Sequence, residues 1–173
     1  MRIKTERLTL RPLCMADLEA THAYASDLEN TRYMVFLPNE TREETERFIR
    51  EAEAQWRSDA PERLEFAILR EGGQIGGMTL FFLGESAAEL GWILDKRHWG
   101  QGYALEAARG LIESARGQWG IRRFIAQCDS ENEASWRLME RLGMRRVGCE
   151  GGRKNRSTNE ERQELTYEIV YDA

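Results

Sequence analysis

The sequence has few of the residues that build metal and redox sites. It contains three cysteines, Cys14, Cys128 and Cys149, and two histidines, His22 and His98. The cysteines are odd in number, and their spacing matches no metal-binding or redox motif. We therefore predict reduced thiols in a cytoplasmic protein, and no bound metal.

Long apolar runs and an excess of positive charge are absent as well. The longest apolar stretch, MTLFFL at residues 78–83, is too short to cross a bilayer, and the first residues lack the apolar core of a signal peptide. The net charge of −5 disfavours a nucleic-acid partner, which would need a basic face. We expect no membrane and no nucleic-acid partner, and a monomer or homodimer.

The residues that are present are typical of one globular domain over 1–173. Hydrophobic residues make up 41% and charged residues 32%, and no repeat or linker divides the chain. Hydrophobic periodicity predicts the elements. Strands are expected at 7–13, twice within 63–83 around a Gly-Gly turn, and at 88–94, 121–128, 144–149 and 164–171, with helices at 16–26, 41–59, 103–118 and 132–143.

This order of elements predicts a mixed α/β (α+β) sheet rather than a fully parallel one. The strand–helix–strand unit over residues 88–128 is expected to be a right-handed parallel crossover. The hairpin within residues 63–83 makes its two strands antiparallel. The polar, glycine-containing segment 150–163 is predicted to be a long mobile loop between the last two strands.

The stretch RHWGQGYA, residues 97–104, separates the strand at 88–94 from the helix that follows. A helix N-terminus presents free backbone N–H groups and the positive end of the helix dipole. Gly100 and Gly102 would let a ligand approach the backbone closely, and Arg97 adds a positive charge. The pattern indicates a phosphate or pyrophosphate site. The alternative is a surface loop in which the glycines only turn the chain.

Comparison with known phosphate-binding motifs limits which ligands this turn could bind. Nothing in the chain matches a P-loop. The dinucleotide fingerprint Gly-x-Gly-x-x-Gly/Ala fits at Gly100 and Gly102, but Leu105 stands at the third position. Asp129, after the next strand, could serve as the ribose-binding acid. A dinucleotide-binding oxidoreductase therefore remains an alternative.

The pattern Arg97-x-x-Gly100-x-Gly102 resembles the signature of the GNAT (Gcn-related N-acetyltransferase) superfamily. Four stretches in order are similar to the branch of ribosomal-protein alanine acetyltransferases: RLTLRPL, ELGWILDKRHWGQGYALEAARGLIE, NEASWRLMERLGMRRVG and ELTYEIV. The resemblance covers nearly the whole chain. It implies the GNAT acyl-CoA N-acyltransferase fold, a mostly antiparallel sheet with one parallel, splayed pair of strands, flanked by helices.

The resemblance also implies a cofactor and a reaction. Acetyl-CoA would be the co-substrate, and its acetyl group would pass directly to a primary amine, on a protein N-terminus or a small molecule, in a ternary complex. A non-catalytic CoA-binding module is the further alternative. The implied acetyl-CoA contacts are Trp92, Ile93, Leu94, Arg97, His98, Trp99, Gly100, Gln101, Gly102, Tyr103, Ala104, Asn132 and Ser135.

Direct transfer needs a group that takes the amine's proton, and Glu89 is the residue that we predict. It shares a strand face with Gly91 and Ile93, and many family members place an acid here. The alternative is a solvated carboxylate or a structural ion pair. Glu106 is a weaker candidate, because an i,i+3 pair with Arg109 is its ordinary explanation.

Ser135 is the predicted proton donor to the leaving thiolate. Many family members use a tyrosine on the helix after the fifth strand, but Met139 stands there. The pattern Asn132-x-x-Ser135 matches the ribosomal-protein branch instead, and Asn132 would also cap its helix. Val147 occupies a place where that branch can carry a glutamate, so no base is expected from it. The acceptor pocket is expected between the helices of residues 16–59 and the segment 153–163.

Overall fold

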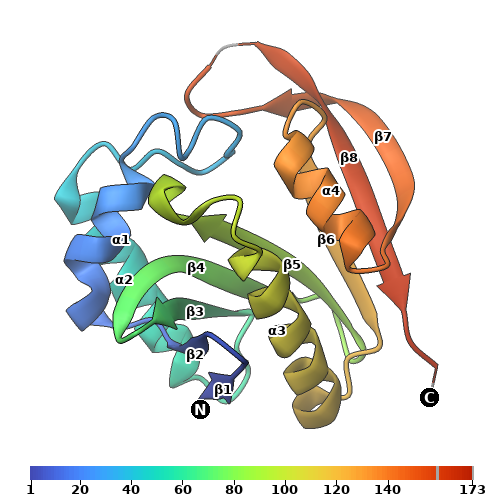
Figure 1. The fold of residues 1–173 in the computed structure, drawn as a ribbon, viewed down its shortest axis with the longest axis horizontal. Helices are drawn as coiled ribbons and strands as arrows, with labels where there is room; N and C mark the ends of the chain where they lie inside the picture. Colours follow the sequence, from blue (N-terminus) through green and yellow to red (C-terminus); the bar gives the residue numbers. More distant parts are fainter. Residues whose placement is uncertain (159, 173) are drawn as a thin grey trace.

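The computed structural model describes residues 1–158 and 160–172, and within them eight strands form one sheet in the order β1-β2-β3-β4-β5-β6-β8-β7 (Figure 1). The strands are β1 (Ile3–Lys4), β2 (Thr9–Pro12), β3 (Arg63–Arg70), β4 (Gly73–Phe82), β5 (Ala87–Leu94), β6 (Arg123–Asp129), β7 (Arg145–Lys154) and β8 (Glu161–Val170). The helices are α1 (Leu18–Ala25), α2 (Arg42–Trp56), α3 (Tyr103–Trp119) and α4 (Glu133–Arg141), with short 3₁₀ turns at Met15–Asp17 and Lys96–His98.

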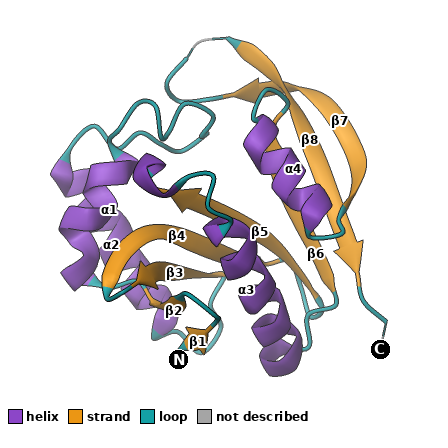
Figure 2. Cartoon of the chain, in the orientation of Figure 1, coloured by secondary structure: helices purple, strands orange, loops and turns teal. Residues whose placement is uncertain are grey.

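The predicted mixed sheet is confirmed. Strands β5 and β6 pair in parallel, and α3 makes the crossover between them, while the other neighbouring pairs are antiparallel. Figure 2 shows helices on both sides of the sheet. The sheet is not a doubly wound parallel one, so the dinucleotide-binding alternative is wrong on fold grounds.

Each face of the sheet has its own apolar core. On one face, the predicted helix α3 buries an apolar stripe at helical spacing, formed by Leu105, Ala108, Leu111, Ile112 and Ala115. On the other face, Ile49 and Ala52 of α2 pack with Ala67. Ala67 and its neighbour Phe66 point to opposite faces because side chains alternate along a strand.

The predicted Gly-Gly turn is displaced by one residue. The hairpin between β3 and β4 turns at Glu71 and Gly72, with φ of 52° and 85°, so Gly73 already pairs with Arg70. The turn therefore needs its left-handed backbone one residue earlier than the Gly-Gly pair suggests.

The expected long loop at residues 150–163 is also wrong. Strand β7 runs to Lys154 and β8 begins at Glu161. Asn155 is buried and the Arg153 side chain is 8% exposed, and both anchor the hairpin through polar contacts rather than apolar ones. That is why hydrophobic periodicity missed it. Asn159 belongs to this segment and lies outside the described residues.

Glu65 is a carboxyl group inside the fold, 6% exposed, and it makes stability depend on pH. Burial raises its pKa to about 7, although Thr79 Oγ1 donates to it at 2.6 Å and Arg63 is nearby. The folded state thus binds a proton that the unfolded state releases near pH 4.5. Stability falls as the pH rises from there to 7, by about 3 kcal/mol in all.

We therefore expect Glu65→Gln to stabilise the protein at pH 8 and to leave it nearly unchanged at pH 4.5. Glutamine keeps an acceptor for Thr79 and removes the charge. Urea unfolding at the two pH values measures the difference. The exposed Glu62→Gln is the matched control. An equal effect of Glu65→Gln at both pH values would contradict the prediction.

Candidate active site

The parallel strands β5 and β6 separate partway along their length. Their pairing runs through Ala87↔Arg123 and Ala88↔Phe124 and ends at Glu89↔Ile125. Beyond it, β5 continues to Leu94 and β6 to Asp129 without pairing to each other within the described chain, and Figure 1 shows them diverging. This is the splayed pair expected from the sequence, and it leaves one backbone edge of each strand without a partner strand.

Three of the predicted acetyl-CoA contacts, Trp92, Ile93 and Leu94, lie on this separated part of β5. Trp92 and Ile93 are half-buried. The Leu94 carbonyl already accepts two hydrogen bonds, from Asn30 Nδ2 at 2.5 Å and from Trp99 Nε1 at 2.9 Å. Its acceptor capacity is therefore used by the protein. Trp92 and Ile93 pair with Met78 and Gly77 of β4, so only the edge of this stretch that faces away from β4 is open to a ligand.

The glycine turn, residues 97–104, brings open N–H groups to the end of β5. Gly100 and Gly102 have φ of 72° and 80°, a left-handed backbone that favours glycine. The first helical bond of α3 runs from Glu106 N to Gly102 O. In the described part of the protein, none of the backbone N–H groups of residues 100–105 meets an acceptor. They form a continuous set of donors at a helix N-terminus, which suits a phosphate group.

Arg97, the predicted cation of this turn, is bound to the preceding acid. Its Nη2 lies 2.6 Å from Asp95 Oδ2, and its Nε and backbone N also donate to Asp95. The side-chain hydrogen bond from Arg97 lowers the pKa of Asp95, against the effect of burial. The Arg97 side chain is 74% exposed. The turn is thus braced by an ion pair, and the charge of Arg97 is balanced within the turn. His98 lies next to Tyr103, with ring centroids 6.4 Å apart.

Sequence reasoning missed Arg7, which comes from the start of the chain to the same turn. Its Nε lies 2.7 Å from Glu106 Oε2, and its Nη1 donates to Gln101 O at 3.1 Å. Thr5 Oγ1 also donates to Glu106, at 2.6 Å. The predicted pairing of Glu106 with Arg109 is therefore wrong, because Arg109 donates to the Arg141 carbonyl instead.

These contacts decide how Glu106 ionises. Burial alone would raise the pKa of Glu106, but hydrogen bonds from Thr5 and Arg7 together lower it. A carboxylate held ionised by a neighbouring guanidinium is a poor proton acceptor at neutral pH. Glu106 therefore ties the N-terminal segment to α3.

Glu89 lies at the last paired position before β5 and β6 diverge. It is half-buried, and among the described residues its carboxyl has no hydrogen bond and no ion pair. Burial raises its pKa, and the nearby charge of Glu164 raises it further. The structural ion pair considered as its alternative role is not found. An unpaired, partly desolvated carboxyl group with a raised pKa is suited to accept a proton near neutral pH.

Asn132 and Ser135 begin α4, immediately after β6. Asn132 Oδ1 accepts from the Ser135 backbone N at 3.3 Å, which confirms Asn132 as the N-cap. The Ser135 side chain lies against the thiol of Cys128 on β6. Burial raises the pKa of Cys128 to about 11, although the Ser135 contact opposes the rise. Met139, at the place of the family's tyrosine, is fully buried.

The β7–β8 hairpin contacts the segment between α1 and α2 (Figure 1). Arg153 donates to Glu164 at 2.5 Å and to the Tyr33 carbonyl at 2.9 Å. The Arg156 backbone N donates to Met34 O at 3.0 Å. The two segments predicted to form the acceptor pocket are therefore adjacent and bonded to each other.

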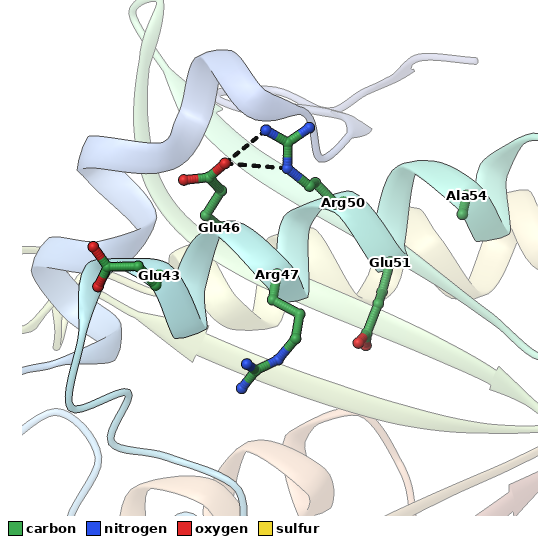
Figure 3. Close-up of a pocket in the computed structure, with 6 residues that line it drawn as sticks. All are labelled: Glu43, Glu46, Arg47, Arg50, Glu51 and Ala54. Carbon is green, nitrogen blue, oxygen red and sulfur yellow. Dashed lines mark hydrogen bonds and ion pairs between the residues drawn. The ribbon is translucent and has the colours of Figure 1, made fainter.

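A depression on α2 holds none of the predicted site residues. Figure 3 shows this depression on the outer side of α2, where an ordinary i,i+4 pair joins Glu46 to Arg50. Within residues 1–158 and 160–172, no cluster of three metal-ligating side chains occurs, and no helix is long and apolar enough to span a membrane.

Comparison with known proteins shows which family the chain resembles. Residues 7–145 match the model of the acetyltransferase (GNAT) domain. An uncharacterized N-acetyltransferase of Bacillus subtilis, YnaD, is 32% identical over 152 residues, which cover 86% of this chain and 85% of the relative. A solved GNAT-family acetyltransferase from Bacillus anthracis is 30% identical, with a TM-score of 0.85 and 98% of each chain covered.

A more distant neighbour shares the fold. RimL, a ribosomal L7/L12 alpha-N-protein acetyltransferase solved in complex with coenzyme A, superposes with a TM-score of 0.87 over 98% of each chain at 18% identity. The matched family model covers most of the chain. The chain therefore belongs to the GNAT acetyltransferase family, and it is an acetyl-CoA-dependent N-acetyltransferase.

Proposed function

We propose that the protein transfers the acetyl group of acetyl-CoA directly to a primary amine in a ternary complex, with Glu89 as the proton acceptor. The observation that carries this proposal is the position of Glu89, unpaired and half-buried where β5 and β6 separate. The glycine turn lies at the far end of the same strand. One strand thus links the base to the donors suited to the pyrophosphate.

The proposed transfer uses two side chains of the protein, Glu89 and Ser135. The amine nitrogen forms a bond to the thioester carbonyl carbon, the carbon–sulfur bond breaks, and the amine's proton goes to Glu89, directly or through water. The Ser135 hydroxyl donates a hydrogen bond to the departing sulfur, and as that sulfur takes the proton the hydroxyl regains one from solvent, so that CoA leaves as the thiol. Cys128 supports transfer without an acyl-enzyme, because a buried thiol with a raised pKa is a poor nucleophile.

The co-substrate contacts are part of the proposal. The N–H groups of residues 100–105 would bind the pyrophosphate, and Trp92 and Ile93 would pair with the pantetheine arm. Asn132 would contact the same arm from α4. The coenzyme A complex of the fold neighbour RimL supports a bound CoA in this fold.

The acceptor is proposed to be a protein N-terminus or a small-molecule amine, bound between β5, the β7–β8 hairpin and the α1–α2 segment. Release of free CoA thiol from acetyl-CoA, measured over a panel of peptide N-termini, amino acids, aminoglycosides and polyamines, tests it. Amine-dependent release supports the proposal. If the protein binds CoA but no amine of the panel causes release of free CoA thiol, the result favours a non-catalytic CoA-binding module instead.

Replacing Ser135 tests the proton donor. We expect Ser135→Ala to lower kcat by roughly one to three powers of ten, because a thiolate is already a fair leaving group. The KM for acetyl-CoA should stay within a few-fold, and Tm should barely shift. Steady-state kinetics and a melting curve measure this. Ser135→Thr, which keeps the hydroxyl, is the control. A lower Tm with an unchanged kcat would leave Ser135 only a structural role.

A further inference from the structure

We infer that Arg7 is a phosphate-binding residue of the glycine turn, with its free Nη2 directed to the pyrophosphate of acetyl-CoA. The inference rests on the proposed function only in taking CoA as the ligand. The sequence points to Arg97 alone as the cation of this turn. Arg7 stands 93 positions before Gly100 in the chain, and no motif connects the two.

The contacts of Arg7 place its guanidinium at the turn itself. Nη1 donates to the carbonyl of Gln101, the residue between the two glycines, at 3.1 Å. The guanidinium carbon lies 4.6 Å from the centroid of the Tyr103 ring, at the first residue of α3. Glu106, one turn further along α3, accepts from both the backbone N and Nε of Arg7 at 2.7 Å. Three successive parts of the turn and helix thus hold this side chain.

The remaining nitrogen, Nη2, is the one left for a ligand. It has no hydrogen-bond partner among the residues that the structure describes. It lies 3.6 Å from the position that a Cβ on Gly102 would take, so it faces the same space that the absence of a side chain leaves open. The free N–H groups of residues 100–105 open beside it. A guanidinium that presents a free edge next to such donors is suited to a phosphate oxygen.

Glu106 fixes this geometry rather than cancelling it. Arg7 donates a hydrogen bond from Nε to the Glu106 carboxylate and another from Nη1 to the Gln101 carbonyl. These two bonds fix the orientation of the guanidinium group. The side chain is already ordered before a ligand binds, which lowers the entropy lost on binding. Arg97, by contrast, has both its Nε and its Nη2 bound to Asp95 within the turn.

The test compares donors with and without phosphates. We expect Arg7→Met to lower kcat/KM for acetyl-CoA by at least about tenfold and to leave kcat/KM for acetyl-pantetheine, which lacks the ADP moiety, nearly unchanged. The KM for the amine should not move. An equal loss with both donors, or no loss with acetyl-CoA, would overturn the inference. Arg7→Lys, which keeps a charge but not the fork, should lie between the two and serves if Arg7→Met does not fold.

Arg11→Met is the matched control. Arg11 lies four residues along the same segment and pairs with Asp17 at 2.7 Å. Its side-chain hydrogen bonds within the described residues go to Pro12, Cys14 and Asp17, and none goes to the turn. It should change stability but not the preference for acetyl-CoA over acetyl-pantetheine. A changed preference there would overturn the assignment to Arg7.

Dephospho-CoA identifies which phosphate is bound. If Arg7→Met weakens the binding of CoA and of dephospho-CoA equally, the pyrophosphate is the partner, as inferred. If the loss disappears with dephospho-CoA, Arg7 binds the ribose 3′-phosphate and the pyrophosphate assignment fails. These binding measurements need no amine acceptor. A wild-type protein that binds CoA but acetylates nothing would therefore refute the proposed function without touching this inference.

Discussion

Gly102→Val is expected to lower the affinity for CoA by roughly two to four powers of ten, the equivalent of losing two charge-assisted hydrogen bonds. Gly102 has φ of 80°, and a β-branched side chain there is strained. The new methyl groups would also stand among the free N–H groups of residues 100–105, beside Arg7 Nη2. Isothermal titration with CoA measures the loss.

Gly120→Val separates backbone strain from loss of the site. Gly120 ends the same helix and has φ of 64°. Apart from its chain neighbours, no atom of the described residues lies within 4 Å of where its Cβ would be. Both valines strain one end of α3, but only the one at Gly102 obstructs the proposed phosphate contacts. We expect Gly120→Val to lower Tm and to leave CoA affinity unchanged. A folded Gly102→Val protein with wild-type affinity would show that CoA does not use the turn.

The structural features that are determined by residues close together in the sequence could be predicted. The helix α3, the N-cap at Asn132 and the glycines of the turn each depend on neighbours within one or two turns of chain. The parallel crossover follows from the order strand, helix, strand along the chain. The partner of Glu106 could not be predicted, because Arg109 is near it in sequence whereas Arg7 is near it only in space. The buried network of Arg153 and Asn155 was missed for the same reason, since a polar, charged stretch has the composition of a loop.

In the active site, too, local features could be predicted from the sequence, and contacts between distant residues could not. The glycine signature identifies where phosphates would bind, since the signature is local. The environment of Glu89 depends on where β5 leaves β6 and on Glu164, which is 75 positions away in the chain. Only the folded chain determines whether that carboxyl group is paired or unpaired, and this decides whether it can act as a base.

Glu89→Gln is expected to keep CoA affinity and to lower kcat by roughly two to four powers of ten at neutral pH, because glutamine cannot take the amine's proton. Burial and Glu164 raise the pKa of Glu89, so the carboxylate is present only above an elevated pKa. As the pH is lowered, kcat/KM should therefore begin to decrease at a higher pH than it would if the base were a glutamate with an ordinary pKa.

The variant's pH profile identifies the base. Without Glu89 that acid limb should vanish, and the residual rate should climb with pH as more of the amine becomes neutral, giving partial rescue at high pH. Glu164→Gln is the second arm: it removes the charge that raises the pKa of Glu89, so the acid limb should move to lower pH while the plateau rate remains. Full activity of Glu89→Gln at neutral pH would show that solvent or another group takes the proton. An unmoved limb in Glu164→Gln, with Glu89→Gln inactive, would instead show that burial alone sets the pKa of the base.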